Sequence, residues 1–199
     1  MKFDSHELTA LLVAISFAAG LNVYATIVAL GLLARFNVLT LPPALELVTS
    51  WYVIAICGVL FVVEFFADKI PAFDLVWNAL HTFVRVPVAA FLAYHATANL
   101  PLWEQMSAAT TGGAIALAAH GGKIAARAMV TPSPEPASNS ALSLAEDAFV
   151  VFLVWFASKH PYWAAAIVAV CLGIIMVLIR WVIRALRDLF VAAERLFAQ

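Results

Sequence analysis

The amino-acid sequence predicts an all-α integral membrane protein with about six transmembrane helices. Six apolar stretches run along its 199 residues, and the stretch 162–179 carries no charge. A helix needs roughly 20 apolar residues to cross about 30 Å of hydrocarbon. Apolar residues make up 65% of the chain, charged residues 12%, and the mean hydropathy is +0.98. Soluble domains average about 45–50% apolar and 25% charged residues, so this composition favours lipid as the main solvent.

The first half of the chain contains three predicted spans with one different segment between them. Segment 68–86 has apolar residues at helical spacing with charges between them, which is typical of an amphipathic helix. We expect this helix to be interfacial or re-entrant, and Pro71 suits its first turn. The third span is short for a crossing unless the amphipathic segment adds turns to it. The three spans are 8–36, 47–66 and 87–98.

The second half supplies the spans 103–130, 144–158 and 162–183. The first of these is rich in Gly and Ala, which let helix backbones approach closely, so we expect it at the centre of the bundle. Segment 131–143 is rich in Pro and Ser and predicts a flexible loop. The tail 184–199 is amphipathic and basic. All 199 residues form a single predicted membrane domain.

The positions of Lys and Arg predict the orientation of this domain. Six spans place both termini on one side, and nine of the 11 Lys and Arg residues fall on that side. Arg35 and Lys159 fall on the other. Because basic residues concentrate in cytoplasmic segments, we expect a multi-pass protein of the inner (plasma) membrane with both termini in the cytoplasm.

The chain also divides into halves, 1–100 and 101–199, that each begin with a Gly-containing helix and continue with a helix that carries two acids. Three spans in each half would give the halves opposite orientations, which is the inverted-repeat plan of many transporters. The alternative is that two small-residue helices resemble each other by composition alone.

Charged residues near the predicted cytoplasmic ends of the spans need an explanation, because charges at membrane depth are costly. Acids and bases at a similar depth can pair, and residues four apart share one helix face. We therefore expect Glu64 or Asp68 to lie within reach of Lys123 or Arg127. The charged pairs are Glu64 with Asp68, Lys123 with Arg127, and Glu146 with Asp147.

Two interpretations of these charges remain open. In the structural one, Glu146 and Asp147 open a helix after Ser143 and complement its dipole, while Lys123 and Arg127 extend toward the headgroups. In the functional one, the charges line a polar cavity that opens to the cytoplasm and binds an ion or an anionic headgroup.

Uncharged polar residues lie deeper in the spans. Asn22, with Tyr24 beside it, either hydrogen-bonds a neighbouring helix or lies at a helix break that lines a solute pathway.

His81 and Arg85 are four residues apart on the amphipathic helix and are expected to contact headgroups. We interpret His120 as a packing residue rather than a ligand.

Sequence motifs for known chemistry are absent. The chain contains no Walker loop, no HExxH, no Gly-x-Ser-x-Gly and no Cys/His cluster with metal spacing. Asp68 and Asp74 flank Pro71, but two carboxylates six residues apart are weak grounds for a metal. We expect no enzyme activity, no cofactor and no metal, and the net charge of -1 predicts no nucleic-acid partner.

Three segments carry a family resemblance that covers most of the chain. They are Gly20-Leu21-Asn22, Glu64 followed by Ala67-Asp68-Lys69-Ile70-Pro71 and Asp74, and a Ser/Asn-rich segment that leads into Glu146-Asp147. The sequence resembles domain of unknown function family 4126, whose members are bacterial and plastid membrane proteins. The resemblance implies a polar centre and supplies no established activity. The residues of that centre are Asp68, Lys69, Ile70, Pro71, Asp74, Glu146 and Asp147.

The sequence favours a small transporter or channel for an ion or small solute. Its acids would bind a cation or proton, while Lys123 and Arg127 would balance charge or bind an anion. The alternatives are the binding or translocation of a lipid or polyprenyl-phosphate headgroup, and a non-enzymatic membrane scaffold. Membrane lipids and an ion or small solute are the expected partners, and homo-oligomerisation is left open. The candidate site residues are Asn22, Glu64, Asp68, Lys69, Asp74, Lys123, Arg127, Glu146 and Asp147.

Overall fold

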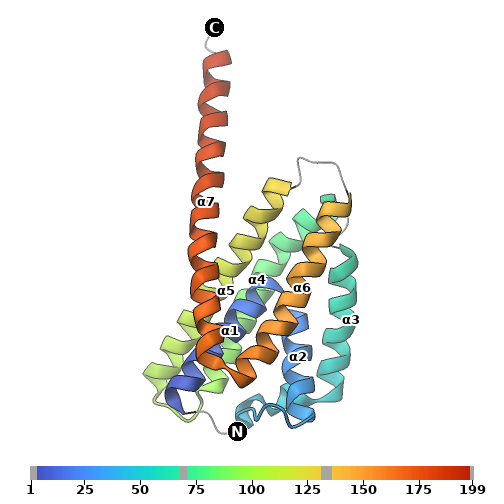
Figure 1. Cartoon of the computed structure of the whole chain (residues 1–199), viewed down its shortest axis with the longest axis vertical. Coiled ribbons are helices and arrows are strands. Elements are labelled where there is room, and N and C mark those ends of the chain that lie inside the picture. The colour runs from blue at the N-terminus through green and yellow to red at the C-terminus, as the bar shows by residue number, and fades with distance from the viewer. Residues whose placement is uncertain (1–3, 68–70, 131–135, 198–199) are drawn as a thin grey trace.

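The computed structural model describes residues 4–67, 71–130 and 136–197. Within these residues the chain forms α-helices, one 3-10 helix and no strand, so the all-α class is confirmed. The long helices run roughly side by side along the long axis (Figure 1). The elements are α1 (Ser5–Leu21), α2 (Val23–Arg35), the 3-10 helix η1 (Pro43–Thr49), α3 (Trp51–Ala67), α4 (Pro71–Ala96), α5 (Leu102–Val130), α6 (Pro136–Lys159) and α7 (Pro161–Phe197).

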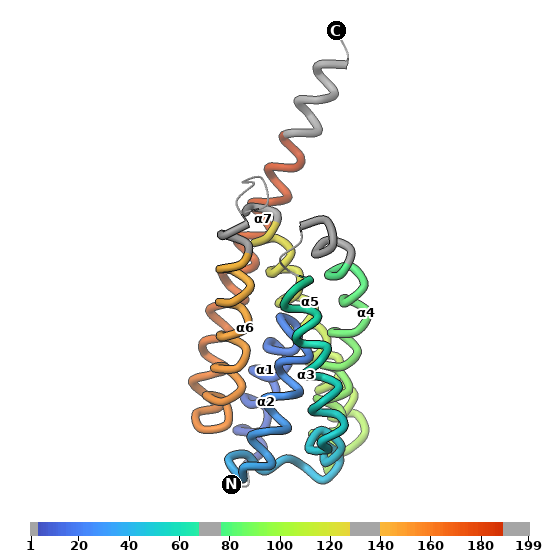
Figure 2. Tube along the Cα trace, turned by 90° about the vertical axis from the view of Figure 1, so that its right-hand side faces the viewer, coloured from blue at the N-terminus to red at the C-terminus, as the bar shows by residue number. Residues whose placement is uncertain are grey.

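The expected first span, 8–36, is broken into two helices at Asn22. Asn22 has an extended backbone (φ -149°, ψ 103°), and its side chain accepts a hydrogen bond from the Ala25 backbone N–H at 2.9 Å. It therefore ends α1 and caps the start of α2. Figures 1 and 2 show α2 turning back toward the end of the bundle where α1 begins. The two helices form a hairpin that does not cross the bundle.

The hairpin changes where the chain ends. The helices α3 to α7 alternate in direction, so the start of α1 and the end of α7 lie at opposite ends of the molecule (Figure 1). This differs from the expectation that both termini share one side. That expectation counted 8–36 as a crossing, whereas the break at Asn22 returns the chain to its starting end.

The most buried helix is α1, in which the residues from Ala10 to Leu21 are almost all buried. The prediction that segment 103–130 lies at the centre is therefore wrong, since α1 holds that place and α5 packs against it. The small residues of α5 still act as expected. A Cβ on Gly20 of α1 would meet the backbone of Ala116 and the methyl group of Ala119, so these two helices touch through their backbones.

The expected amphipathic helix 68–86 and short span 87–98 are parts of one helix, α4, within which Pro87 lies. Residues 68–70 lie outside the described part. The polar face of α4 points into the bundle, where Asn78, His81 and Arg85 are buried. The prediction of an interfacial or re-entrant helix is therefore wrong in its placement, because periodicity identifies a polar face but not what that face contacts.

The predicted loop 131–143 is helical over most of its length, because α6 begins at Pro136. Proline suits the first turn of a helix, where its missing N–H has no intrahelical partner. Residues 131–135 lie outside the described part. Glu146 and Asp147 thus lie well inside α6 rather than at its start, and the expected interaction with the dipole at the start of the helix is wrong.

Two described helical segments are long and apolar enough to cross a membrane, namely Ser140–Lys159 and Pro161–Asp188. The pair η1 and α3, bent by 58°, would make a third. Six crossings are thus not confirmed. The inverted repeat also lacks support, because the first half contains the α1–α2 hairpin and η1, whereas the second half consists of three continuous helices.

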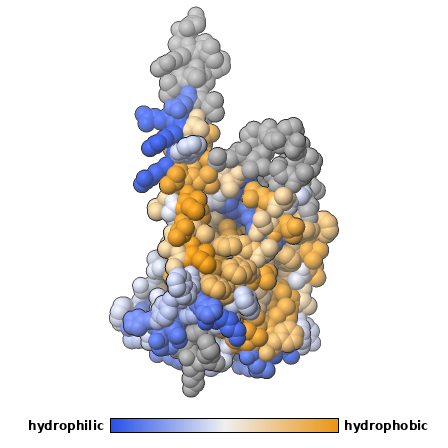
Figure 3. Space-filling view, viewed as in Figure 1, coloured by the Kyte–Doolittle hydropathy of each residue, from blue (hydrophilic) through white to orange (hydrophobic). Residues whose placement is uncertain are grey.

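Large apolar side chains are exposed on α3, α4, α5, α6 and α7. Figure 3 shows an apolar band across the middle of one face, with hydrophilic residues at the end where α1 begins and on α7 where it rises above the bundle. Along this band α7 exposes large side chains such as Ile174, Val177 and Trp181.

Candidate functional site

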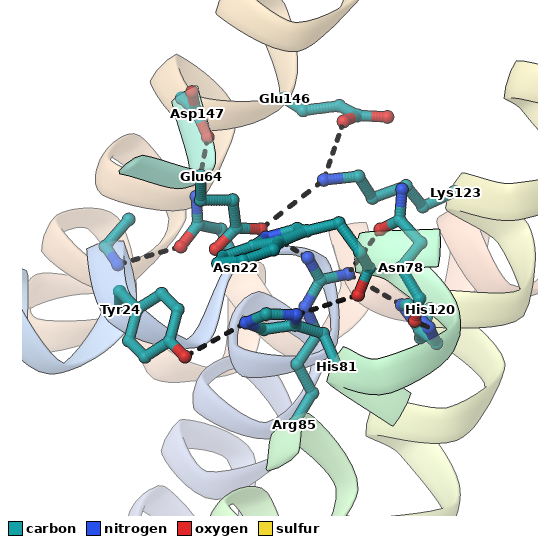
Figure 4. A network of polar contacts seen from close by, with 12 residues as sticks. Asn22, Tyr24, Glu64, Asn78, His81, Arg85, His120, Lys123, Glu146 and Asp147 are labelled. Carbon is teal, nitrogen blue, oxygen red and sulfur yellow. Dashed lines mark hydrogen bonds and ion pairs between the residues drawn. The ribbon is translucent and has the colours of Figure 1, made fainter. Parts of the chain in front are cut away.

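Charged side chains from four helices meet in the part of the bundle beyond the α1–α2 turn (Figure 4). Among the described residues, three acids and three bases form this group, which we call the charge cluster. The acids and bases come from α3, α4, α5 and α6. The cluster consists of Glu64, Arg85, Lys123, Arg127, Glu146 and Asp147.

Two bases interact with the Oε1 atom of Glu64. Arg85 Nη2 donates a hydrogen bond to it, and Lys123 Nζ lies 3.7 Å away. The expected contact between Glu64 and Lys123 is therefore present. The side chains of Glu64 and Arg85 are both 0% exposed. Burying one ion costs several kcal/mol, so each of these charges depends on the others for its stability.

Glu146 lies at the outer end of the cluster and contacts two bases. Its Oε2 atom lies 3.4 Å from Lys123 Nζ and accepts a hydrogen bond from Arg127 Nη2 at 3.1 Å. Lys123 thus lies between Glu64 and Glu146. Lys123 and Arg127 are one turn apart on the inner face of α5 and are only 2% and 4% exposed. The expectation that they extend outward to headgroups is therefore wrong.

Asn22 connects the helix break to the cluster. Its Nδ2 atom donates a hydrogen bond to Asp147 Oδ1 at 2.9 Å, while its own Oδ1 accepts from Ala25. The positive end of the α2 dipole therefore lies beside the Asp147 carboxylate, which is a favourable arrangement. One buried amide thus both ends a helix and contacts an acid on α6.

Arg85 also contacts His120 on α5. Arg85 Nη1 lies 2.7 Å from His120 Nδ1 and 3.2 Å from Asn78 Oδ1. A guanidinium has only donors, so His120 Nδ1 must accept and its ring carries a proton on Nε2. That N–H points at the Asn78 backbone carbonyl, 3.0 Å away. His120 is therefore a neutral acceptor for Arg85, and the prediction of a packing residue misses this role.

A second histidine, His81, lies on α4 between two fixed partners. Its Nδ1 atom donates to the Trp77 backbone carbonyl at 2.8 Å, which leaves Nε2 to accept from the Tyr24 hydroxyl at 3.0 Å. His81 thus links α4 to α2 next to the helix break. The expectation that His81 and Arg85 contact headgroups is wrong, because both are buried in the bundle.

The structure brings most of the sequence-predicted residues together. Asp68 and Lys69 lie outside the described residues, as does the side chain of Asp74. Sequence reasoning missed Arg85 as the main partner of Glu64. Its signal was the spacing of Asn78, His81 and Arg85 along one face of a helix that continues into an apolar span. The predicted residues placed at the cluster are Asn22, Glu64, Lys123, Arg127, Glu146 and Asp147.

The cluster has unmet hydrogen-bonding capacity within the described part of the molecule. Glu64 Oε2 is a buried acceptor and Arg85 Nε a buried donor, and neither has a hydrogen-bond partner there. Each such group costs about 1–3 kcal/mol. A polar ligand that both donates and accepts would recover this energy. No three His, Cys, Asp or Glu side chains among the described residues are grouped to hold a metal ion.

Comparison with known proteins identifies a protein family to which the chain is similar. No significant match was found among curated proteins or among solved structures. A family described as Domain of unknown function (DUF4126) matches residues 9–181, a range that includes the whole charge cluster. The chain belongs to this family.

Proposed function

We propose that the protein is a small membrane transporter that binds a charged solute at the charge cluster. The observation that carries this proposal is the complete burial of Glu64 and Arg85 inside a bundle that exposes many large apolar side chains. Ionisable groups within membrane helices are costly and mark solute, ion or proton pathways. Apolar residues of similar volume would often stabilise a core as well or better, so stability alone gives little reason for these charges.

Exposed tryptophans support a membrane around the bundle. Trp51, Trp103 and Trp163 are exposed near the starts of α3, α5 and α7, which share one end of the molecule. Tryptophan is enriched at membrane interfaces. Exposed Trp181 follows Trp163 by 18 residues of α7, which is about 27 Å of helix. This length is close to the hydrocarbon thickness of about 30 Å, so these residues fit the two interfaces.

Glu64 falls between these two levels. It follows Trp51 by 13 residues of α3, which is about 20 Å of helix. The charge cluster would therefore lie within the hydrocarbon layer, nearer the end where α7 leaves the bundle.

The exposed basic residues support an orientation. Arg180, Arg184 and Arg187 are exposed on α7 at one end, whereas Arg35 and Lys159 are exposed at the other. By the positive-inside rule, the end of α7 faces the cytoplasm and the start of α1 faces the opposite side. This revises the expectation of two cytoplasmic termini.

The hairpin supports transport over a purely structural role. Transporters commonly bind substrates and coupling ions where discontinuous helices end at mid-membrane, because the free backbone ends and dipoles are available there. Here α1 ends and α2 begins at Asn22, whose side chain contacts Asp147 of the cluster.

A thermal-stability panel with the full-length protein in detergent tests this proposal. Na⁺, K⁺, small charged metabolites and a short-chain zwitterionic phospholipid are added singly. A solute at 100 times its Kd stabilises by about 2.7 kcal/mol, which at about 2–4 °C per kcal/mol raises the melting temperature by about 5–11 °C. Glu146→Gln should abolish the response, and Glu46→Gln, an exposed change on η1, should retain it. No response to any of these compounds, or an equal response in Glu146→Gln, contradicts the proposal.

A further inference from the structure

We propose that the substrate reaches the charge cluster sideways from the bilayer, through a groove between α3 and α6, and that it is a phospholipid with an ammonium headgroup. This inference rests on the proposed function and names its substrate class. The groove is a wide-open depression with a volume of about 580 Å³. Its walls include Phe61 from α3 and Asp147, Val151, Phe152 and Trp155 from α6.

The groove results from the helix break. α3 packs against α2 and η1, and α2 begins at Val23, beside Glu64 of the charge cluster (Figure 4). Beyond that level α3 and α6 stand apart at the edge of the bundle (Figure 2). There the ion pairs of Glu64 with Arg85 and Lys123 tie α3 to the rest of the molecule.

The apolar part of the groove fits a lipid chain. Val151, Phe152 and Trp155 are partly exposed along its wall, on the side that faces hydrocarbon in the proposed membrane placement. Trp155 lies four residues from the end of α6, and Asp147 lies eight residues further along the helix, or about 12 Å. A chain along this wall would therefore place its polar end beside Asp147.

The charge at the polar end selects the headgroup. Asp147 is the one charged residue among the described walls of the groove, so a headgroup meets a carboxylate first. An ammonium group complements it, whereas an anionic headgroup without an ammonium is repelled. Further in, Lys123 and Arg127 lie 3.4 and 3.1 Å from Glu146 Oε2. A lipid phosphate that replaces the Glu146 carboxylate there could bind both bases. A headgroup with both an ammonium and a phosphate complements Asp147 as well as Lys123 and Arg127.

Native mass spectrometry of the full-length protein tests this assignment. Detergent-purified protein is mixed with equal amounts of phosphatidylethanolamine and phosphatidylglycerol. We expect bound phosphatidylethanolamine to exceed phosphatidylglycerol by about tenfold, and Asp147→Asn to abolish that preference. Ala148→Trp fills the groove and should remove the bound lipid. The control Ala166→Trp places the same side chain on an exposed position of α7 and should retain it. Phe152→Ala, which opens the wall without adding bulk, should weaken binding if Ala148→Trp does not fold.

Three outcomes overturn the inference and leave the proposed function standing. They are equal retention of both lipids, a preference for phosphatidylglycerol, and identical lipid binding in Ala148→Trp and Ala166→Trp. The lipid measurement does not depend on transport activity. A water-soluble solute that stabilises the protein equally in both tryptophan variants would likewise exclude lateral access but support a transporter. Lipid that binds as expected but is not moved across the bilayer by the reconstituted protein would instead count against the proposed function.

Discussion

Glu64→Gln is expected to destabilise the protein strongly, because it removes the negative charge that two buried bases share. Arg85, 0% exposed, would retain only the neutral partners Asn78 and His120. Removing one partner of a buried ion pair costs about 3–5 kcal/mol. In a chain of this size, 1 kcal/mol shifts the melting temperature by about 2–4 °C. The melting temperature of Glu64→Gln should therefore fall by about 6–20 °C.

Thermal unfolding of the detergent-purified full-length protein measures this fall, with intrinsic tryptophan fluorescence as the signal. Glu46→Gln is the matched control, since Glu46 is exposed and its melting temperature should not change. The double variant Glu64→Gln with Arg85→Gln removes both charges, so it should lose less stability than the two single variants together. A Glu64→Gln protein that melts within about 2 °C of the wild type refutes the reasoning. Strict additivity of the two changes would do the same.

Further predictions follow from the packing and the topology. Gly20→Ala should destabilise by at least about 1–3 kcal/mol because its Cβ would meet the backbone of α5. Gly58→Ala, with open space around it, should leave the melting temperature unchanged or raise it. Equal melting temperatures of the Gly20→Ala and Gly58→Ala proteins would contradict the close packing of α1 against α5. Asn22→Asp keeps a good helix cap but places a carboxylate beside Asp147, so it should melt below Asn22→Ser; the reverse order would exclude the contact. Reporter fusions at the two termini should report opposite sides of the membrane, and a shared side would contradict the hairpin.

The all-α fold class and the positions of several helices could be predicted, because both depend on the local pattern of apolar and polar residues. The Gly/Ala-rich span 103–130 matches α5 closely, and the boundary between the predicted spans 144–158 and 162–183 falls where α6 ends and α7 begins. The spacing of Lys123 and Arg127 also placed them correctly on one face. These features depend on neighbours within a few residues, which the sequence displays directly.

A helix break at Asn22 could be predicted only as one of two alternatives, because the cause of the break is distant in the sequence. An asparagine within an apolar run can remain in a continuous helix, and the residue that holds it here, Asp147, is 125 positions away. The number of crossings could not be predicted for the same reason. The side assigned to a terminus from the Lys and Arg residues depends on this number, and one turn within a predicted span changes it.

The role of Arg85 was missed for a different physical reason. Periodicity places Asn78, His81 and Arg85 on one face of a helix, but it does not distinguish an interior partner from water or a headgroup. The partner of Arg85 is Glu64 on α3, and only the packing of α3 against α4 brings the two together.

Solute uptake by reconstituted vesicles tests most directly whether a charged solute moves through the charge cluster. Wild-type protein, Glu64→Gln, Glu146→Gln and the control Glu46→Gln are compared at a temperature well below the lowest melting temperature, with uptake divided by the amount of folded protein. The wild type and Glu46→Gln should take up, or move across the bilayer, the compound identified by thermal stabilisation, and the two cluster variants should not. Equal uptake per folded molecule in all four proteins would contradict the central claim.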